Sequence, residues 1–125
     1  MHLSIVTGTY NRYVLLQRFM NSCREQIPAG VSYEFVITGV AGDEPTLTYL
    51  QQQPDVKLII HEGLLGAVKA FTDACELATG KYCLIANDDV EIQPGSILRA
   101  MVHLEENPRC GAVAFQDNRL NKDAF

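Results

Sequence analysis

The sequence predicts a doubly wound α/β domain, in which helices cover both faces of a mostly parallel sheet. Short apolar runs alternate along the chain with segments whose apolar residues recur at helical spacing. The runs are apolar on both faces, which is typical of parallel strands buried between helices. With 125 residues, 47% of them hydrophobic, the chain fits one domain over residues 1–125.

The first half of the chain predicts two strands and two helices. Leu3–Thr7 is a short apolar run and the first strand. Tyr13–Gln26 has apolar residues at helical spacing, and Tyr33–Thr38 is the second strand. Pro45–Gln53 is a short helix that Asp43 or Glu44 starts and Pro54 ends.

The second half continues the alternation. A third strand, Val56–His61, precedes a helix over Gly66–Ala78 that Gly80 closes. Lys81–Ala86 is the fourth strand. Pro94–Glu106 is a helix with proline in its first turn. A fifth strand is expected over Gly111–Phe115, and the polar tail after it has no predicted structure.

Composition excludes some classes of function. The net charge is −5 and no basic run occurs, so a nucleic-acid surface is not expected. No signal peptide or transmembrane segment is evident. The cysteines lack CxxC spacing, which favours reduced, mostly buried thiols in a cytoplasmic protein over disulfides or a zinc site. These four residues are Cys23, Cys75, Cys83 and Cys110.

Asn87, Asp88 and Asp89 end the predicted fourth strand. Open α/β sheets bind ligands outside the carboxyl ends of their strands, and paired carboxylates there suit Mg²⁺ or Mn²⁺. Side-chain alternation places Asn87 and Asp89 on one face and Asp88 on the other, so the two aspartates would hold different partners unless the backbone bends. A plain exit of solvated acids into a turn is equally consistent with this segment alone.

A second polar segment, Thr9-Tyr10-Asn11-Arg12, follows the first predicted strand. It brings a hydroxyl, an aromatic ring and backbone N–H groups to the ligand-binding edge. Taken alone, this segment is also consistent with Asn11 as a simple helix cap and Tyr10 in local packing.

Together, the two segments resemble those of the family 2 glycosyltransferases, whose nucleotide-binding half is a Rossmann-like sheet of the GT-A type. That family opens with a Thr-Tyr-Asn-Arg-like turn, matched by Val6-Thr-Gly-Thr-Tyr-Asn-Arg12. It later leads into Asp-rich residues, matched by Ala78-Thr-Gly-Lys-Tyr82 and Asn87-Asp-Asp89, with Pro94-Gly95 after them. The resemblance covers nearly the whole chain.

The resemblance implies roles for these residues. Asp89 matches the last carboxylate of the metal motif and would hold a divalent ion, Mn or Mg, at the diphosphate of a nucleotide-sugar donor. Asp88 would reach the ribose or the sugar. Tyr10 would lie against the base and Thr9 at the same pocket wall, in the turn that Asn11 and Arg12 complete.

His61 and Lys69 complete the expected nucleotide-sugar-binding set. Either side chain could pair with a phosphate or face the base. A solvated lysine and an ordinary strand-end histidine fit the sequence as well or better.

Two departures from the family pattern matter. The family's second strand usually ends in acids, one of which binds the base, but Gly39 and Val40 stand there. Either Asp43 or Glu44 takes the place of those acids from the loop, or recognition of the base is altered or lost. A further alternative is that Gly39 only shapes a turn and Asp43 only caps the next helix.

The second departure is length. Only 36 residues follow Asp89, where the family usually has roughly another hundred that supply the acceptor side and a catalytic carboxylate. An isolated N-terminal domain, a truncation and a naturally short protein all fit this length. Asp117 and Asp123 are the carboxylates past the last predicted strand, and neither is assigned as a base, so the catalytic residue is unknown.

Three functions are therefore compared. The first is a metal-dependent glycosyltransferase, or a fragment of one, acting on an unknown acceptor that could be a glycan, lipid or protein. The second is a catalytically incomplete nucleotide-sugar-binding module. The third is a receiver-like regulator. Such a protein would have acids at the end of its first strand, but Thr7-Gly8-Thr9 stands there, so this function is disfavoured.

Overall fold

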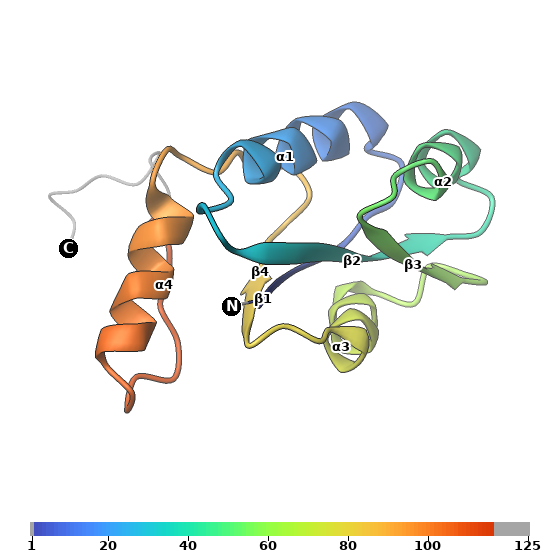
Figure 1. Cartoon of the computed structure of the whole chain (residues 1–125). Coiled ribbons are helices and arrows are strands. Elements are labelled where there is room, and N and C mark those ends of the chain that lie inside the picture. Colours follow the sequence, from blue (N-terminus) through green and yellow to red (C-terminus); the bar gives the residue numbers. More distant parts are fainter. Residues whose placement is uncertain (1, 117–125) are drawn as a thin grey trace, which may run out of the picture.

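The computed structural model describes residues 2–116 and contains one sheet with helices between its strands (Figure 1). All pairings are parallel, in the order β3-β2-β1-β4. This confirms the predicted α/β class with a parallel sheet. The elements are β1 (His2–Gly8), α1 (Tyr13–Glu25), β2 (Ser32–Val40), α2 (Glu44–Gln51), β3 (Val56–His61), α3 (Ala67–Leu77), β4 (Tyr82–Ile85) and α4 (Ser96–Glu106).

Helices lie on both faces of the sheet, as predicted. Figure 1 shows α1 and α2 on one face and α3 on the other. Side chains alternate accordingly along β1, where Ile5 and Val6 are both fully buried but belong to opposite cores. The larger core, between the sheet and the helices α1, α2 and α4, includes Leu16, Phe19, Met20, Phe35, Ile37, Leu50, Ile97 and Met101.

The predicted fifth strand is wrong. Residues 111–116 have no regular secondary structure and are mostly exposed, and Phe115 keeps 40% of its surface in water. The run contains glycine and alanine, whose small side chains bury little apolar surface. Too little burial is therefore available to hold the segment as a strand.

The sequence predicted reduced, mostly buried cysteines. All four cysteines are free, but most of them are not buried, so the prediction of burial was wrong. Only Cys23 is fully buried, and burial raises the pKa of its thiol to about 12. Cys75 and Cys83 are exposed. Cys83 belongs to β4, at the edge of the sheet, whereas α3 packs mainly against β1 and β2.

A buried carboxylate, Glu34 of β2, links four segments of the fold. It accepts hydrogen bonds from the Ser4 hydroxyl at 2.7 Å and from the backbone and hydroxyl of Thr79, each at 2.8 Å. Lys57 Nζ lies 2.6 Å from its other oxygen. These partners satisfy a charge that would otherwise be costly to bury.

None of the helices between residues 2 and 116 has the length and apolar character that crossing a bilayer requires.

Candidate functional site

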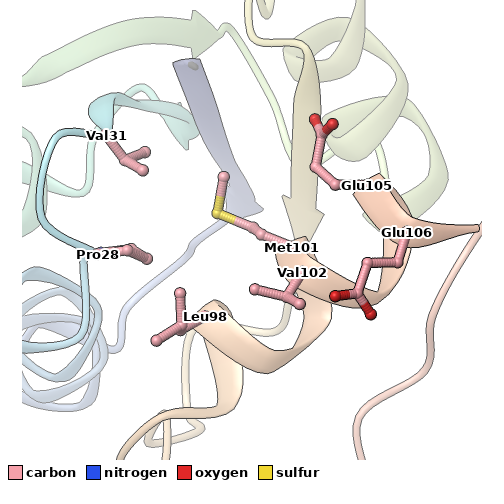
Figure 2. Close-up of a pocket in the computed structure, with 7 residues that line it drawn as sticks. All are labelled: Pro28, Val31, Leu98, Met101, Val102, Glu105 and Glu106. Atoms are coloured by element: carbon pink, nitrogen blue, oxygen red, sulfur yellow. The ribbon is translucent and has the colours of Figure 1, made fainter.

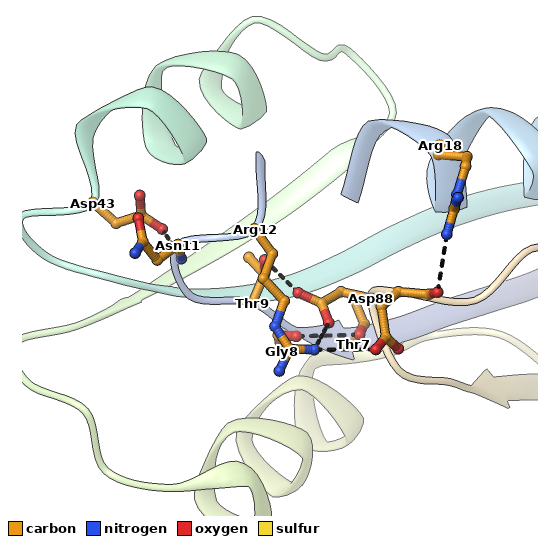
Figure 3. Close-up of polar contacts among 9 residues, drawn as sticks. Thr7, Gly8, Thr9, Asn11, Arg12, Arg18, Asp43 and Asp88 are labelled. Carbon is orange, nitrogen blue, oxygen red and sulfur yellow. Dashed lines mark hydrogen bonds and ion pairs between the residues drawn. The ribbon is translucent and has the colours of Figure 1, made fainter. Parts of the chain in front are cut away.

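Three loops meet at the carboxyl edge of the sheet because its strands are parallel. They follow β1, β2 and β4 and contain the Thr9–Arg12 turn, Asp43 and Asp88 (Figure 3). Asp89 comes directly after Asp88 in the loop that follows β4. This is the edge at which open α/β sheets bind ligands. The two polar segments singled out in the sequence therefore lie together.

Asp88 is a buried carboxylate of the site, with 4% of its surface exposed. The Thr9 hydroxyl donates to Asp88 Oδ2 at 2.8 Å, and Arg12 Nη1 lies 3.2 Å from Oδ1 (Figure 3). A buried carboxylate requires such donors to offset its lost hydration. These contacts join the loop after β4 to the turn after β1.

Asp89 is more open to solvent, with 42% of its side chain exposed. Its Oδ2 lies 3.3 Å from the same Arg12 Nη1, and its backbone carbonyl accepts from Arg18 Nη2 at 3.4 Å. The two aspartates therefore share Arg12, which is the case that the prediction allowed if the backbone bends. Because β4 ends at Ile85, the chain has left the strand before these residues, and strand alternation no longer sets their directions.

Asn11 does not cap α1. Arg12 holds the N-cap position without a side-chain cap hydrogen bond, and Asn11 adopts a left-handed backbone with φ of 57°. Asparagine tolerates this conformation better than most residues. Its backbone N–H donates to Asp43 Oδ2 at 2.7 Å (Figure 3). The β2–α2 loop thereby fixes the turn that follows β1.

Tyr10 is 47% exposed, so local packing leaves its ring available. The neighbouring residues Asn11 and Arg12, together with Asp43, line a cavity of about 350 Å³. A second cavity, of about 270 Å³, lies against α4 and next to Val31, which precedes β2 (Figure 2). It is mostly apolar and is at the amino end of that strand, away from the polar loops.

The end of β2 is apolar where the family pattern led us to expect an acid. A side-chain carbon added at Gly39 would come within 2.8 Å of Leu47 Cδ2, so Leu47 of α2 fills that space. Val40 is buried and apolar. Asp43, which is 7% exposed, is the acid that the loop brings to the Thr9–Arg12 turn. Although it has the N-cap position of α2, its side chain makes no cap hydrogen bond.

His61 and Lys69 are both bound to Asp73 of α3. His61 Nε2 lies 2.7 Å from Asp73 Oδ2, and Lys69 Nζ lies 2.9 Å from Oδ1. This group lies at the end of β3 and on α3, and two strands, β2 and β1, separate β3 from β4 and its aspartates. Asp73 was not predicted as a partner, although its spacing of four residues from Lys69 on a helix favours such a pair.

The donor set at the β4 edge fits part of a divalent metal site. Asp88 and Asp89 offer carboxylate oxygens, which are hard ligands, and Asp89 is accessible to solvent. Within residues 2–116, however, no group of three or more His, Cys, Asp or Glu could hold a metal ion. Phosphate oxygens and water would have to complete the coordination, as is usual for Mg²⁺.

Comparison with known families defines the class of this protein. The family model for glycosyl transferase family 2 matches residues 4–124. The chain therefore belongs to this family. No curated protein sequence gave a significant match.

Solved glycosyltransferase structures share the fold. S. aureus TarS residues 1–349 superposes with a TM-score of 0.75 at 21% identity, over 93% of this chain and 39% of that one. TarS with UDP-GlcNAc gives 0.74 at 22%, over 86% and 32%. A mannosyltransferase, PcManGT from Pyrobaculum calidifontis with GDP-Man and Mn²⁺, gives 0.70 at 22%, over 82% and 32%. The chain thus spans about 39% or less of these proteins.

Proposed function

We propose that the chain is the donor-binding part of a metal-dependent glycosyltransferase, which transfers a sugar from a nucleoside-diphosphate donor to an unknown acceptor. The observation that carries this proposal is the Asp88–Asp89 pair facing the Thr9–Arg12 turn. Family membership supports it, as do structural neighbours whose ligands are UDP-GlcNAc and GDP-Man with Mn²⁺.

In this proposal, Asp89 holds the divalent ion, because its carboxylate is the accessible one of the pair. When bound, such an ion neutralises negative charge on the leaving diphosphate. Asp88 hydrogen-bonds the ribose or the sugar, and its bond to Thr9 fixes its position. The exposed ring of Tyr10 stacks on the base.

The remaining donor contacts are proposed from position. Asn11 and Arg12 form the end of the turn and line the cavity beside it. His61 and Lys69 contact the base or a phosphate from the β3–α3 side, where Asp73 orients both. The four free cysteines are consistent with the cytoplasm, where thiols stay reduced, as the proposed location.

A catalytically incomplete binding module is the alternative. Inverting transfer requires a base beside the acceptor hydroxyl. The described carboxylates around the aspartate pair already have partners: Asp43 binds Asn11, Asp88 and Asp89 bind Arg12, and Glu91 pairs with Arg18. Asp117 and Asp123, the acids considered from sequence, lie outside the described residues.

Thermal shift measurements test the donor site. UDP, GDP and their sugar conjugates would be added with Mn²⁺, with Mg²⁺ and with a chelator. A ligand bound by the folded state raises Tm, and a concentration 100 times the Kd adds about 2.7 kcal/mol of stability. We expect a metal-dependent rise for at least one nucleotide. No shift with any of them at millimolar concentration would contradict the proposal.

A further inference from the structure

Arg12 is the cation that the two aspartates share. One nitrogen, Nη1, lies 3.2 Å from Asp88 Oδ1 and 3.3 Å from Asp89 Oδ2. A single positive charge thus faces two carboxylates, in the position expected of a counter-ion. These are the same carboxylates that supply oxygen ligands to the proposed metal site.

The Arg12 side chain can leave these carboxylates at modest cost. It is 50% exposed, so water can solvate the guanidinium once it moves. Asp88 would keep the hydrogen bond from the Thr9 hydroxyl at 2.8 Å. Asp89 is 42% exposed and would be hydrated. Neither acid would therefore be left buried and without a partner.

We propose that Arg12 is an internal counter-ion, which a divalent metal and a nucleoside diphosphate displace together. This inference rests on the proposed donor site. A metal ion bound to Asp89 and the guanidinium compete for the same carboxylate and repel each other. A metal ion that binds without nucleotide must therefore move the Arg12 guanidinium into water. This displacement costs free energy and weakens the binding of the metal.

A bound diphosphate gives the displaced guanidinium a new partner. Its planar fork of donors matches phosphate oxygens better than a point charge does. The diphosphate thus offsets the free-energy cost of moving Arg12 away from the carboxylates, which is the cost that weakens metal binding. Because such coupling is reciprocal, the metal strengthens nucleotide binding by the same factor. Arg12 acts here as a positioning residue that makes the two ligands bind as a pair.

The test compares Mn²⁺ binding to the parent chain and to Arg12→Met, measured from the paramagnetic resonance signal of free Mn²⁺. Without nucleotide, we expect Arg12→Met to bind Mn²⁺ at least about fivefold more tightly, the lower end of usual coupling factors. Adding UDP or GDP should raise Mn²⁺ affinity in both proteins. This gain from the nucleotide should be smaller in Arg12→Met than in the parent.

Arg18→Met is the matched control, because Arg18 reaches the Asp89 backbone carbonyl and Glu91 but not the two aspartate carboxylates. It removes the same charge nearby and should leave Mn²⁺ affinity close to that of the parent. Equal Mn²⁺ affinity of Arg12→Met and parent would overturn the inference. An equal gain in Arg18→Met would overturn it as well, since net charge alone would then explain the effect.

A measurement on the parent protein guards against a variant that fails to fold. The Arg12 side-chain N–H resonance should shift when Mg²⁺ and UDP or GDP are added together, and much less with Mg²⁺ alone. An unchanged resonance despite nucleotide binding would refute the displacement. If no nucleotide binds at all, the proposed function fails, whereas the comparison of Mn²⁺ affinities without nucleotide still decides whether Arg12 suppresses metal binding.

Discussion

The carboxylate of Asp43 accepts a hydrogen bond from the backbone N–H of Asn11 at 2.7 Å, across 32 positions of sequence. On the other side of the same turn, Asp88 accepts from Thr9 at 2.8 Å. Two acids from different loops therefore hold the turn between β1 and α1 (Figure 3). A turn fixed before the ligand arrives loses less conformational freedom on binding.

Asp43→Ala should loosen this turn and weaken nucleotide binding. The change removes the partner of the Asn11 N–H, and leaving such a group unsatisfied costs about 1–3 kcal/mol. Urea unfolding and calorimetry with UDP or GDP would measure both effects. Asp43→Asn keeps an acceptor oxygen and should retain most of the stability. Exposed Glu44 provides a control, since Glu44→Ala should change neither property.

Asp89→Ala should abolish the metal-dependent part of nucleoside diphosphate binding and leave the fold intact. The side chain is 42% exposed, so its removal creates no cavity in the core. Calorimetric titrations with UDP and GDP, with and without Mn²⁺, would show the effect. Glu91→Ala removes an acid two residues away and should bind like the parent. Metal-dependent affinity that is equal in Asp89→Ala and parent would eliminate Asp89 as the metal ligand.

Tyr10→Ala should weaken nucleotide binding about tenfold or more without lowering Tm. Base stacking on an aromatic ring is worth roughly 1–3 kcal/mol in single-stranded nucleic-acid sites. Because the ring is 47% exposed, it contributes little to the core. Tyr10→Phe keeps the stacking face and should bind like the parent. If phenylalanine and alanine weaken binding equally, the hydroxyl rather than the ring makes the contact.

Much of the fold follows from local pattern. The four strands found were predicted within about two residues, because apolar runs between glycine, proline and polar residues leave little choice. Gly111–Phe115 shows where the pattern fails, since a run of small residues resembles a strand yet buries little surface.

The candidate site was predicted as two segments but not as a set of contacts. Parallel strand ends were enough to bring Thr9–Arg12 and Asp88–Asp89 together. The sharing of Arg12 depends on a turn after β4 and joins residues 76 and 77 positions apart, which spacing does not reveal. Likewise, Leu47 fills the space beside Gly39 because α2 packs against β2.

Acid should unfold the parent chain partly through Glu34. Burial alone would raise the pKa of this carboxyl, but hydrogen bonds from Lys57, Ser4 and Thr79 outweigh it and hold the pKa at about 2. A folded-state pKa below the ordinary 4.5 means that stability is present above about pH 5 and is lost as pH falls toward 2. The shift corresponds to at most about 3 kcal/mol.

Urea unfolding of the parent and Glu34→Gln between pH 2 and pH 7 would measure this contribution. The variant should be less stable at pH 7 and should lose less stability on acidification. Asp55, whose pKa is also lowered by its hydrogen bonds with Arg24 and Tyr33 against the opposing effect of burial, contributes equally to both proteins. Parallel pH profiles would show that Glu34 does not carry the effect.

Finally, these 125 residues should bind a donor but transfer sugar poorly or not at all. The carboxylates described around Asp89 pair with Arg12, Arg18 or the Asn11 N–H, and none of them is assigned as the base that transfer requires. General-base catalysis contributes about 10²–10⁴-fold, and aligning donor with acceptor contributes more. Slow hydrolysis of the donor by water is therefore the most that we expect. A radiolabelled donor assayed with a panel of acceptors would measure transfer. Robust, saturable transfer that disappears in Asp89→Ala would contradict this prediction, and it would mean that Asp117 or a carboxylate of a partner chain completes the site.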